Sequence, residues 1–340
     1  DAVARMLDAD PTCALALYTG KAATAAPSQA HLRDAVRRLR VTTTDVDDLA
    51  TALRRFRGTQ WLHIVARATA GIATVAQTMR ALSDLADVIV DVCARYLLRR
   101  ARSVGGPFVT AGCGWAGFAV VAQGKLGGRE LNVSSDIDLQ FFYDRPEVHD
   151  AATSELHGRY TTVARRLIYA LSHSDAMGMG YRVDMDLRPE GQKGPLVNAV
   201  PAAEAYYATF GAPWERLALI RARHIGGAAW VTAGFLRSVH SFVYPRHVAE
   251  DTVAKVRSVA NSIGSSRRAA RLRLGDAPGI DIKRDRGGIR DVELFVQTLQ
   301  HLHGGQHPTL QTGSLTAALT ALPLCGVLPL ATCADLRQSY

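Results

Sequence analysis

The sequence predicts an α+β protein in which a small mixed sheet has helical domains on both sides. Alanine- and leucine-rich segments with helical periodicity fill the first part of the chain. Short apolar runs rich in β-forming residues follow, separated by glycine-bearing loops. Helical periodicity then returns. Because 340 residues are too many for one ordinary core, we expect a helical region over 1–105, an α/β core over 106–240 and a second, truncated helical region over 241–340.

The N-terminal region has the spacing of helices. Leu32, Val36 and Leu39 recur at i, i+4 and i+7 and so share one helix face. The stretch Trp61–Leu98 contains no proline and no strand-like alternation. Ser103–Gly117 is rich in glycine, which indicates a boundary before the core.

The core begins with two apolar runs. Phe118–Ala122 and Ile137–Tyr143 predict paired strands joined by a polar, glycine-bearing turn region. Ala151–Ser172 returns to helical spacing. In Tyr181–Leu187 apolar residues alternate with arginine and aspartate, which predicts a half-buried strand.

Further helices follow the third predicted strand. Ala202–Phe210 and Trp214–Arg223 are predicted helices, and each is directly preceded by a proline, a residue favoured at helix starts. The turn-rich segment Gly275–Gly288 contains the strand-like stretch Ile280–Lys283. A predicted helix over Ile289–His303 comes next.

The composition limits the partners. The net charge is +9, but only five of the 40 basic residues are lysine, and this arginine bias is typical of a GC-rich genome. Charge alone therefore does not predict a nucleic-acid partner. No stretch reaches the roughly 18 uncharged apolar residues of a membrane span, so we expect no membrane association.

The cysteine pattern indicates a reducing environment. The chain has five cysteines, an odd number, and no CxxC pair, which argues against a disulfide framework or a zinc site. Residues 1–19 lack the basic start and apolar run of a secretory signal. We therefore expect a cytoplasmic protein.

The first candidate site is a glycine-rich loop followed by two carboxylates. Asp136 and Asp138 lie two positions apart at the start of a predicted strand, so both point to one face. Two like charges on one face repel unless a cation lies between them, and Mg²⁺ prefers such oxygen ligands. Gly124 and Gly127 let backbone N–H groups approach a phosphate, and Lys125 adds a positive charge. The alternative is an exposed strand start with two solvated aspartates.

The third predicted strand carries the second candidate site. Four of its charged residues would share one face: Arg182, Asp184, Asp186 and Arg188. A strand beside Asp138 would supply the third carboxylate that two-metal phosphoryl chemistry uses. The alternative is a lattice of Arg–Asp pairs across strands.

Basic residues also occur in the next two segments. The loop Pro189–Pro195 holds Lys193 and two glycines, and it is either a phosphate-covering loop or a plain turn. On a helix, Arg216, Ile220 and Arg223 would form one stripe. That stripe is either an electropositive wall or a set of paired surface arginines.

A third candidate site precedes the helix predicted over 289–303. Gly287 and Gly288 open onto its N-terminus, which can hold an anion. Asp291 and Glu293 lie in its first turns, where they also favour the helix dipole. The alternative is a well-capped structural helix.

Four blocks of the sequence resemble one known family, in the family's order. They are GKLGGRELNVSSDIDLQFFY, YRVDMDLRPEGQKGPLV, EAYYATFGAPWERLALIRAR and DIKRDRGGIRDVELFVQTLQHLHGGQHPTLQT, from about residue 120 to 312. They are similar to the bifunctional glutamine-synthetase adenylyltransferase/deadenylylase family. Complete members are far longer, so the chain resembles a fragment of one.

This resemblance implies a nucleotidyltransferase-like fold for the core. Members of the family carry two related halves: one adds AMP to a tyrosine of glutamine synthetase, and the other removes it by phosphorolysis and releases ADP. The forms SSDIDL and GGIRD are more similar to the N-terminal, deadenylylating half, because the other half more often reads SDLDL and GGIVD. The implied partners are glutamine synthetase, phosphate, ADP or ATP and, in the full-length form, a nitrogen-signalling regulatory protein.

The resemblance also implies roles for residues. Asp136 and Asp138 correspond to ligands of Mg²⁺, and Gly124 and Ser135 belong to the phosphate-binding loop. The third carboxylate is Asp184 or Asp186; Asp184 is favoured because relatives often have arginine at the other position. Together with the residue-based analysis, the candidate phosphate- and nucleotide-binding set is Gly124, Lys125, Gly127, Ser135, Arg188 and Lys193.

Three functions remain open at this point. The first is removal of AMP from glutamine synthetase. The second is transfer of AMP or another nucleotidyl group, to the synthetase or to RNA ends. The third is a non-catalytic fragment that docks on glutamine synthetase.

Overall fold

The computed structural model describes residues 27–38, 45–103, 117–144, 151–175, 178–247, 254, 281–283 and 287–340. The chain divides into two compact units. The first comprises residues 1–203 and 223–235, and the second comprises residues 204–222 and 236–340. The predicted boundary between residues 105 and 106 lies outside the described residues.

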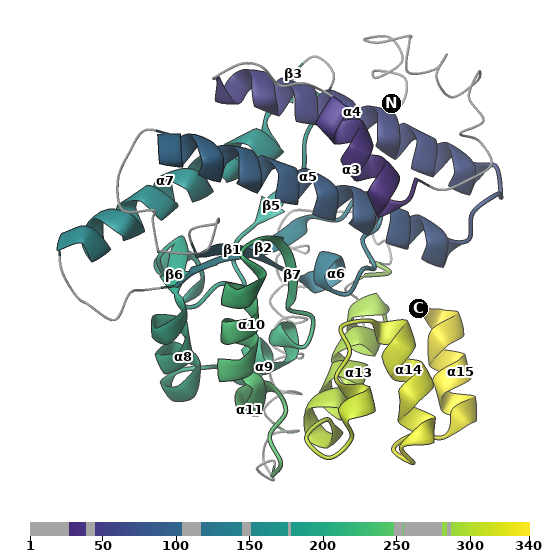
Figure 1. Ribbon diagram of the computed structural model, residues 1–340. Coiled ribbons are helices and arrows are strands. Elements are labelled where there is room, and N and C mark those ends of the chain that lie inside the picture. The colour runs from purple at the N-terminus through teal and green to yellow at the C-terminus, as the bar shows by residue number, and fades with distance from the viewer. Residues whose placement is uncertain are drawn as a thin grey trace, which may run out of the picture. The chain divides into compact units, whose positions relative to one another are not determined.

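Helices form the described N-terminal part, as predicted (Figure 1). They are α3 (Gln29–Arg38), α4 (Val46–Thr69) and α5 (Val75–Ser103). The carboxylate of Asp45 caps α4 by accepting from the backbone N–H of Asp47 at 3.2 Å. None of the described helices is long and apolar enough to cross a bilayer.

The central sheet of the first unit is small and mixed, as predicted. Its strands are β1 (Phe118–Gln123), β2 (Ile137–Tyr143), β5 (Val183–Asp184), β6 (Val197–Ala199) and β7 (Arg223–Gly227). One edge of β2 pairs antiparallel with β1, and β7 pairs antiparallel with the far edge of β1. The start of β2 pairs parallel with β5, and its end pairs parallel with β6.

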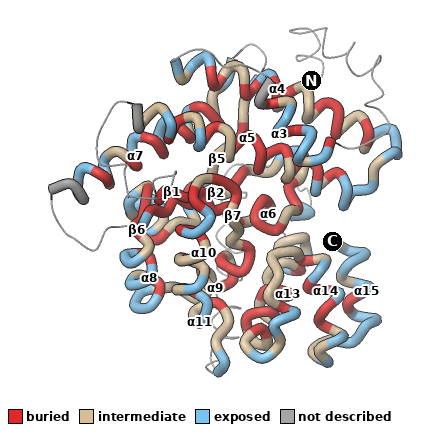
Figure 2. Tube along the Cα trace, viewed as in Figure 1, coloured by how far each residue is buried: buried red, intermediate tan, exposed pale blue. Residues whose placement is uncertain are grey.

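Alternation along β2 sends its side chains to two different layers. One set packs into the core with α4, α5 and α7 (Ala151–Ser172): Ile137, Leu139, Phe141 and Tyr143. The intervening Phe142 stacks on Phe235 of α10 (Ala229–Ser238), with ring centroids 3.9 Å apart. Both faces of the sheet are therefore covered, and Figure 2 shows β1 and β2 as buried. Asp138 belongs to the same alternating set as Phe142, so its side chain is on the face opposite the core formed with α4, α5 and α7.

Shorter elements complete the first unit. The loop after β1 forms the single helical turn α6 (Gly124–Gly127), and a two-stranded ribbon consists of β3 (Ser174–Asp175) and β4 (Gly178–Met179). The turn η2 (Gly191–Lys193) precedes β6, and α8 (Val200–Thr209), which starts in the first unit and continues into the second, follows it.

The second unit is helical. Its elements include α9 (Pro213–Leu219), α11 (His240–Val243), α13 (Ile289–His303), η3 (Pro308–Leu310), α14 (Leu315–Leu324) and α15 (Leu330–Ser339). Its C-terminal helices share an apolar core that includes Val296, Leu310, Leu319 and Leu322. The predicted helix over Ile289–His303 is confirmed at both ends.

The strand predicted over Tyr181–Leu187 is wrong in length. Only Val183 and Asp184 pair with β2, at Ile137 and Asp138, and the end of the same edge pairs with β6 instead. The chain turns directly after Asp184, and the Arg188 N–H donates to the Met185 carbonyl at 3.3 Å. Consequently the four charged residues of this segment do not share one strand face.

The helix predicted over Trp214–Arg223 is wrong at its C-terminal end. It stops at Leu219, and Arg223 opens β7 instead. The expected stripe of Arg216, Ile220 and Arg223 therefore does not exist. Arg216 lies over the ring of Phe242, 4.1 Å from its centroid, and donates to that residue's carbonyl.

Candidate active site

The glycine loop and the carboxylate strand meet at the point where β1 ends and β2 begins. Gln123 is in register with Asp138, and Gly124 follows at once. Gly124 has φ of +55°, and a Cβ built on it would lie 2.0 Å from Oδ2 of Asp138. Only glycine permits both the left-handed backbone and this approach. The sequence thus brings the backbone of the loop directly against one carboxylate.

The neighbouring strand β5 supplies a second carboxylate. Asp184 is in parallel register with Asp138, so both side chains leave the sheet on the same face. Asp186 lies in the turn beyond the strand. Its backbone N–H donates to Oδ1 of Asp184 at 2.7 Å, and its own carboxylate accepts from Gln192 at 2.9 Å. Asp184, rather than Asp186, is therefore the neighbour of Asp138.

Asp136 lies just before β2 and contacts a different partner. The guanidinium of Arg182 forms an ion pair with its carboxylate and also donates to the carbonyl of Ser134. Both members of the pair are about half exposed, so the pair is worth about 1 kcal/mol or less. In the same loop the hydroxyl of Ser135 donates to Oδ1 of Asn132 at 2.7 Å. These contacts fix the conformation of the loop. Because the Arg182–Asp136 pair is weak and exposed, a cation can replace Arg182 at the carboxylate of Asp136 at little cost.

The carboxylates have the donor chemistry of a magnesium site but not its closed geometry. Within the described parts of the chain, no three His, Cys, Asp or Glu side chains are grouped so as to hold a metal ion. Asp138 and Asp184 are adjacent in register, while Asp136 is engaged by Arg182. Oxygen-only donors of this kind suit Mg²⁺. The residues present therefore fit a divalent cation, provided that Asp136 exchanges its partner.

The candidate phosphate-binding residues fall into two groups. Lys125 lies half-buried in α6 together with Gly127, directly after the loop glycine. Lys193 is exposed in η2. Arg188 is tied to its own turn, because its guanidinium donates to the carbonyls of Met185 at 2.8 Å and Gly194 at 3.4 Å. Lys125 and Gly127 therefore belong to the short helix that starts at the glycine beside Asp138, whereas the guanidinium of Arg188 is bonded to backbone carbonyls of its own turn.

The third predicted site has a structural role within the second unit. The carboxylate of Asp291, in the first turn of α13, accepts from the backbone N–H of Gly287, just before the helix, at 2.8 Å. Glu293 pairs with the buried Arg221 at 3.2 Å and accepts from the hydroxyl of Tyr340 at 3.2 Å. Lys283 is described, whereas residues 284–286 lie outside the described part. A structural helix, the alternative to an anion site, accounts for these contacts, although no side chain caps the N-terminus of α13.

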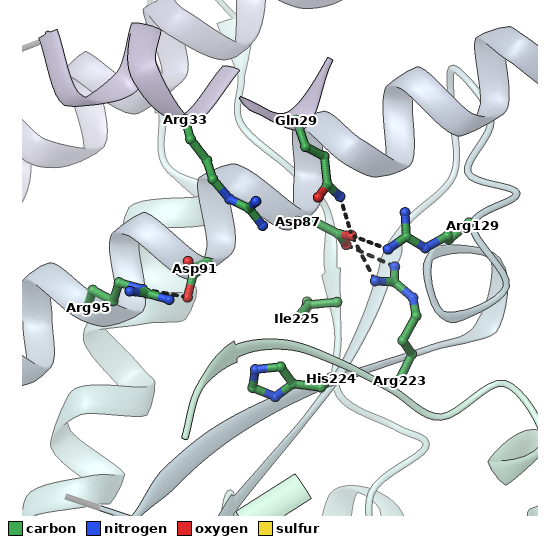
Figure 3. Close-up of a pocket in the computed structure, with 9 residues that line it drawn as sticks. All are labelled: Gln29, Arg33, Asp87, Asp91, Arg95, Arg129, Arg223, His224 and Ile225. Atoms are coloured by element: carbon green, nitrogen blue, oxygen red, sulfur yellow. Dashed lines mark hydrogen bonds and ion pairs between the residues drawn. The ribbon is translucent and has the colours of Figure 1, made fainter. Parts of the chain in front are cut away.

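Sequence reasoning missed a cluster of charged side chains from α5, β7 and the loop that follows α6 (Figure 3). Its centre is Asp87 on α5, whose two carboxylate oxygens accept from the guanidinium of Arg223 at 2.7 and 2.9 Å. Arg129 pairs with Asp84 of the same helix at 2.9 Å. Burial raises the pKa of Asp87, while the nearby Arg223 and Arg129 oppose that shift.

One sequence signal pointed toward this cluster. Asp84 and Asp87 lie one turn apart in the mostly apolar stretch 81–90 of α5, which is an unusual place for two carboxylates. Nothing in the sequence, however, identified Arg223, the partner of Asp87, which is 136 positions away from it.

Comparison with known proteins gives two family matches. Residues 1–238 match the family described as glutamate-ammonia ligase adenylyltransferase. Residues 262–340 match the PII-uridylyltransferase family.

Curated relatives with the same name occur in several bacteria. The bifunctional glutamine synthetase adenylyltransferase/adenylyl-removing enzyme of Pseudomonas aeruginosa is 38% identical over 299 residues, which is 87% of this chain and 30% of the relative. Those of Hahella chejuensis and Nitrosococcus oceani are 37% and 34% identical over 86% of this chain. The chain spans about 30% of the length of these relatives.

Proposed function

The chain belongs to the glutamate-ammonia ligase adenylyltransferase family, and from that premise we propose that it removes AMP from an adenylylated tyrosine of glutamine synthetase in the cytoplasm. The reaction is a Mg²⁺-dependent phosphorolysis that releases ADP and reactivates the synthetase. The observation that carries the proposal is the placement of Asp138 between the loop glycine Gly124 and the carboxylate of Asp184. The motifs SSDIDL and GGIRD support the direction of removal.

The carboxylates serve as the cation site in this proposal. Asp138 and Asp184 would hold Mg²⁺, joined by Asp136 once Arg182 has left it. The bound ion supplies positive charge that offsets the phosphates brought together in the site. Displacing Arg182 costs little because that ion pair is exposed to solvent.

The loop serves as the anion site. α6 begins at Gly124, the residue whose backbone lies against Asp138; in this proposal its backbone N–H groups and the ammonium of Lys125 bind phosphate oxygens. An oxygen of inorganic phosphate bonds to the phosphorus of AMP, and the bond from that phosphorus to the tyrosine oxygen breaks. Tyrosine then leaves as a phenolate and takes up a proton. Because the reference pKa of tyrosine is about 10, this leaving group requires no strong general acid.

The test supplies the chain with adenylylated glutamine synthetase, Mg²⁺ and phosphate, and measures ADP. A parallel sample contains unmodified synthetase and labelled ATP. We expect ADP in the first sample and no label transfer in the second. Transfer of label to the synthetase would instead identify an adenylyltransferase, and transfer of label to RNA ends in a third sample that contains RNA would identify a different nucleotidyltransferase.

A non-catalytic docking fragment is the second candidate, favoured by the short span of the chain relative to its relatives. Binding to glutamine synthetase without any Mg²⁺-dependent product would support it.

A nitrogen-signalling protein is a further proposed partner of the longer form. The support is the match of residues 262–340 to a family named for the uridylylation of PII. Addition of a PII-type protein is expected to change the rate of AMP removal by the full-length protein. An unchanged rate over a saturating range would exclude that partner.

A further inference from the structure

A continuous chain of contacts connects α5 to the carboxylate strand. Asp87 on α5 holds the guanidinium of Arg223 on β7 at 2.7 and 2.9 Å. The same guanidinium donates to the carbonyls of Leu126 at 2.8 Å and Gly127 at 3.0 Å. These are the last two carbonyls of α6, whose first residue is the glycine that touches Asp138.

A second set of contacts holds the same loop where it leaves α6. The hydroxyl of Ser83 accepts from the backbone N–H of Leu131 at 3.1 Å, and Asp84 pairs with Arg129. Arg129 has φ of +59°, which is uncommon for a residue other than glycine. Such a conformation persists only where surrounding contacts fix it. One face of α5 therefore anchors the loop through the side chains of Ser83, Asp84 and Asp87.

The charged side chains of this cluster pair with one another and hold the loop in place; they are not arranged to bind a ligand. A cavity of about 130 Å³ lies among them. Three of the arginines that line it already face carboxylates: Arg223 on Asp87, Arg95 on Asp91, and Arg129 beside both Asp84 and Asp87. Figure 3 shows Arg129 and Arg223 both pointing at the carboxylate of Asp87. An anion entering the cavity would have to displace these internal partners.

We propose that Arg223, oriented by Asp87, is a positioning residue that sets the distance between the phosphate loop and Asp138. This inference rests on the proposed function. Arg223 fixes the end of α6 by two carbonyls, and the start of α6 meets the carboxylate at a contact that admits only glycine. A shift at one end of a single helical turn is therefore transmitted to the other.

The guanidinium shape is essential to this role. Arg223 makes four hydrogen bonds to two carboxylate oxygens and two carbonyls. A lysine ammonium keeps the charge but has three donors at one point and cannot span the same acceptors. Arg223→Lys therefore preserves the charge of the cluster and removes the hydrogen bonds that join Asp87 to the end of α6.

The chain offers a matched control. Arg95 lines the same cavity but pairs with Asp91 on its own helix, at 2.8 Å. Arg95→Lys makes the same chemical change without touching α6. Because a misplacement of about 1 Å can cost roughly 100-fold in rate, we expect Arg223→Lys to lower kcat for ADP release by at least tenfold. Arg95→Lys is expected to stay within about twofold of the unchanged chain.

The experiment compares the two variants and Asp87→Asn in the full chain. It measures kcat, KM for phosphate, the affinity for ADP with Mg²⁺ by calorimetry, and Tm. We expect Arg223→Lys and Asp87→Asn to lose kcat and ADP affinity while remaining folded, and their double variant to lose no more than the worse single one. Equal losses in Arg223→Lys and Arg95→Lys, or additive losses in the double variant, would overturn the proposal.

The outcome separates this inference from the proposed function. If the unchanged chain releases no ADP, the proposed direction of reaction fails, and the affinities for ADP still decide whether Arg223 positions the loop. If the unchanged chain is active and both affinity and kcat are insensitive to Arg223→Lys, only the positioning role fails.

Discussion

The contact between Gly124 and Asp138 is the tightest constraint on the candidate site. The left-handed backbone of Gly124 and the 2.0 Å that would separate an added Cβ from the carboxylate are independent reasons for glycine at this position. From the sequence, glycine there was explained only by the approach of backbone to phosphate. The structure adds that the same glycine lets the loop touch the carboxylate strand.

Replacing this glycine tests the contact. Gly124→Ala is expected to lower the rate of ADP release by about 100-fold, because the new methyl group must push the loop or Asp138 aside. Gly71→Ala is the control: Gly71 also has a positive φ, of +71°, but nothing lies within 4 Å of its Cβ position. It should lose about 1 kcal/mol of stability and no activity. Equal activity of the two variants would contradict the account.

The third carboxylate is the next residue-scale choice. Asp184→Asn is expected to weaken Mg²⁺ binding, measured by calorimetry in the presence of ADP, by at least tenfold. Asp186→Asn should change it by less than about threefold, because Asp186 lies in the turn and bonds to Gln192. A larger loss of Mg²⁺ affinity in Asp186→Asn than in Asp184→Asn would identify the turn residue, and not the residue of β5, as the third ligand.

The buried amide of Gln123, in register with Asp138, is expected to lower the stability of the fold. Its side chain is fully buried next to Asp138 in register, and neither of its polar atoms has a hydrogen-bond partner within the described residues. An unpaired buried amide costs about 1–3 kcal/mol. We therefore expect Gln123→Met to raise Tm by several degrees. A lower Tm would show that the amide is satisfied in the folded protein.

Sequence periodicity correctly predicted the elements whose own residues show a clear apolar face. The strand over Ile137–Tyr143 and the helix over Ile289–His303 agree with the structure because one face of each is continuously apolar. β6 and β7 were missed because they are short, and the sheet edges they pair with form only in the folded chain. For the same reason the predicted strand Tyr181–Leu187 was too long.

The contacts of α13 give an element-scale prediction. Glu293 faces the buried Arg221, so Glu293→Gln is expected to cost about 3 kcal/mol in unfolding free energy by leaving that charge poorly compensated. Glu155→Gln, which breaks an exposed pair with Arg159, should cost less than about 1 kcal/mol. Chemical denaturation measures both. A catalytic loss in Glu293→Gln without destabilisation would contradict the structural role.

The whole chain should be less stable in mild acid. Burial lowers the pKa of His224 in the first unit and of His301 in the second. A histidine whose pKa is depressed in the folded state contributes stability above its unfolded pKa of about 6.5, and that contribution is lost as the pH falls through the folded value. Tm should therefore fall between pH 7.5 and 5.5.

The substitution His301→Asn tests how much of the fall in Tm with acid comes from His301. His301 is buried, and its Nδ1 lies 2.7 Å from the carbonyl of Val243. His301→Asn keeps a donor near that carbonyl and removes the titration, so its Tm should fall less steeply with acid. The exposed His31→Asn serves as the control and should retain the full slope. Equal slopes in all three proteins would exclude His301 as a source.

The central claim concerns the carboxylates of β2, and ADP release measures it most directly. The unchanged chain, Asp136→Asn and Asp138→Asn would each be given adenylylated glutamine synthetase, phosphate and Mg²⁺. We predict that the unchanged chain releases ADP only when Mg²⁺ is present, and that both variants fold with near-normal Tm and release none. Undiminished ADP release by either folded variant would contradict the assignment.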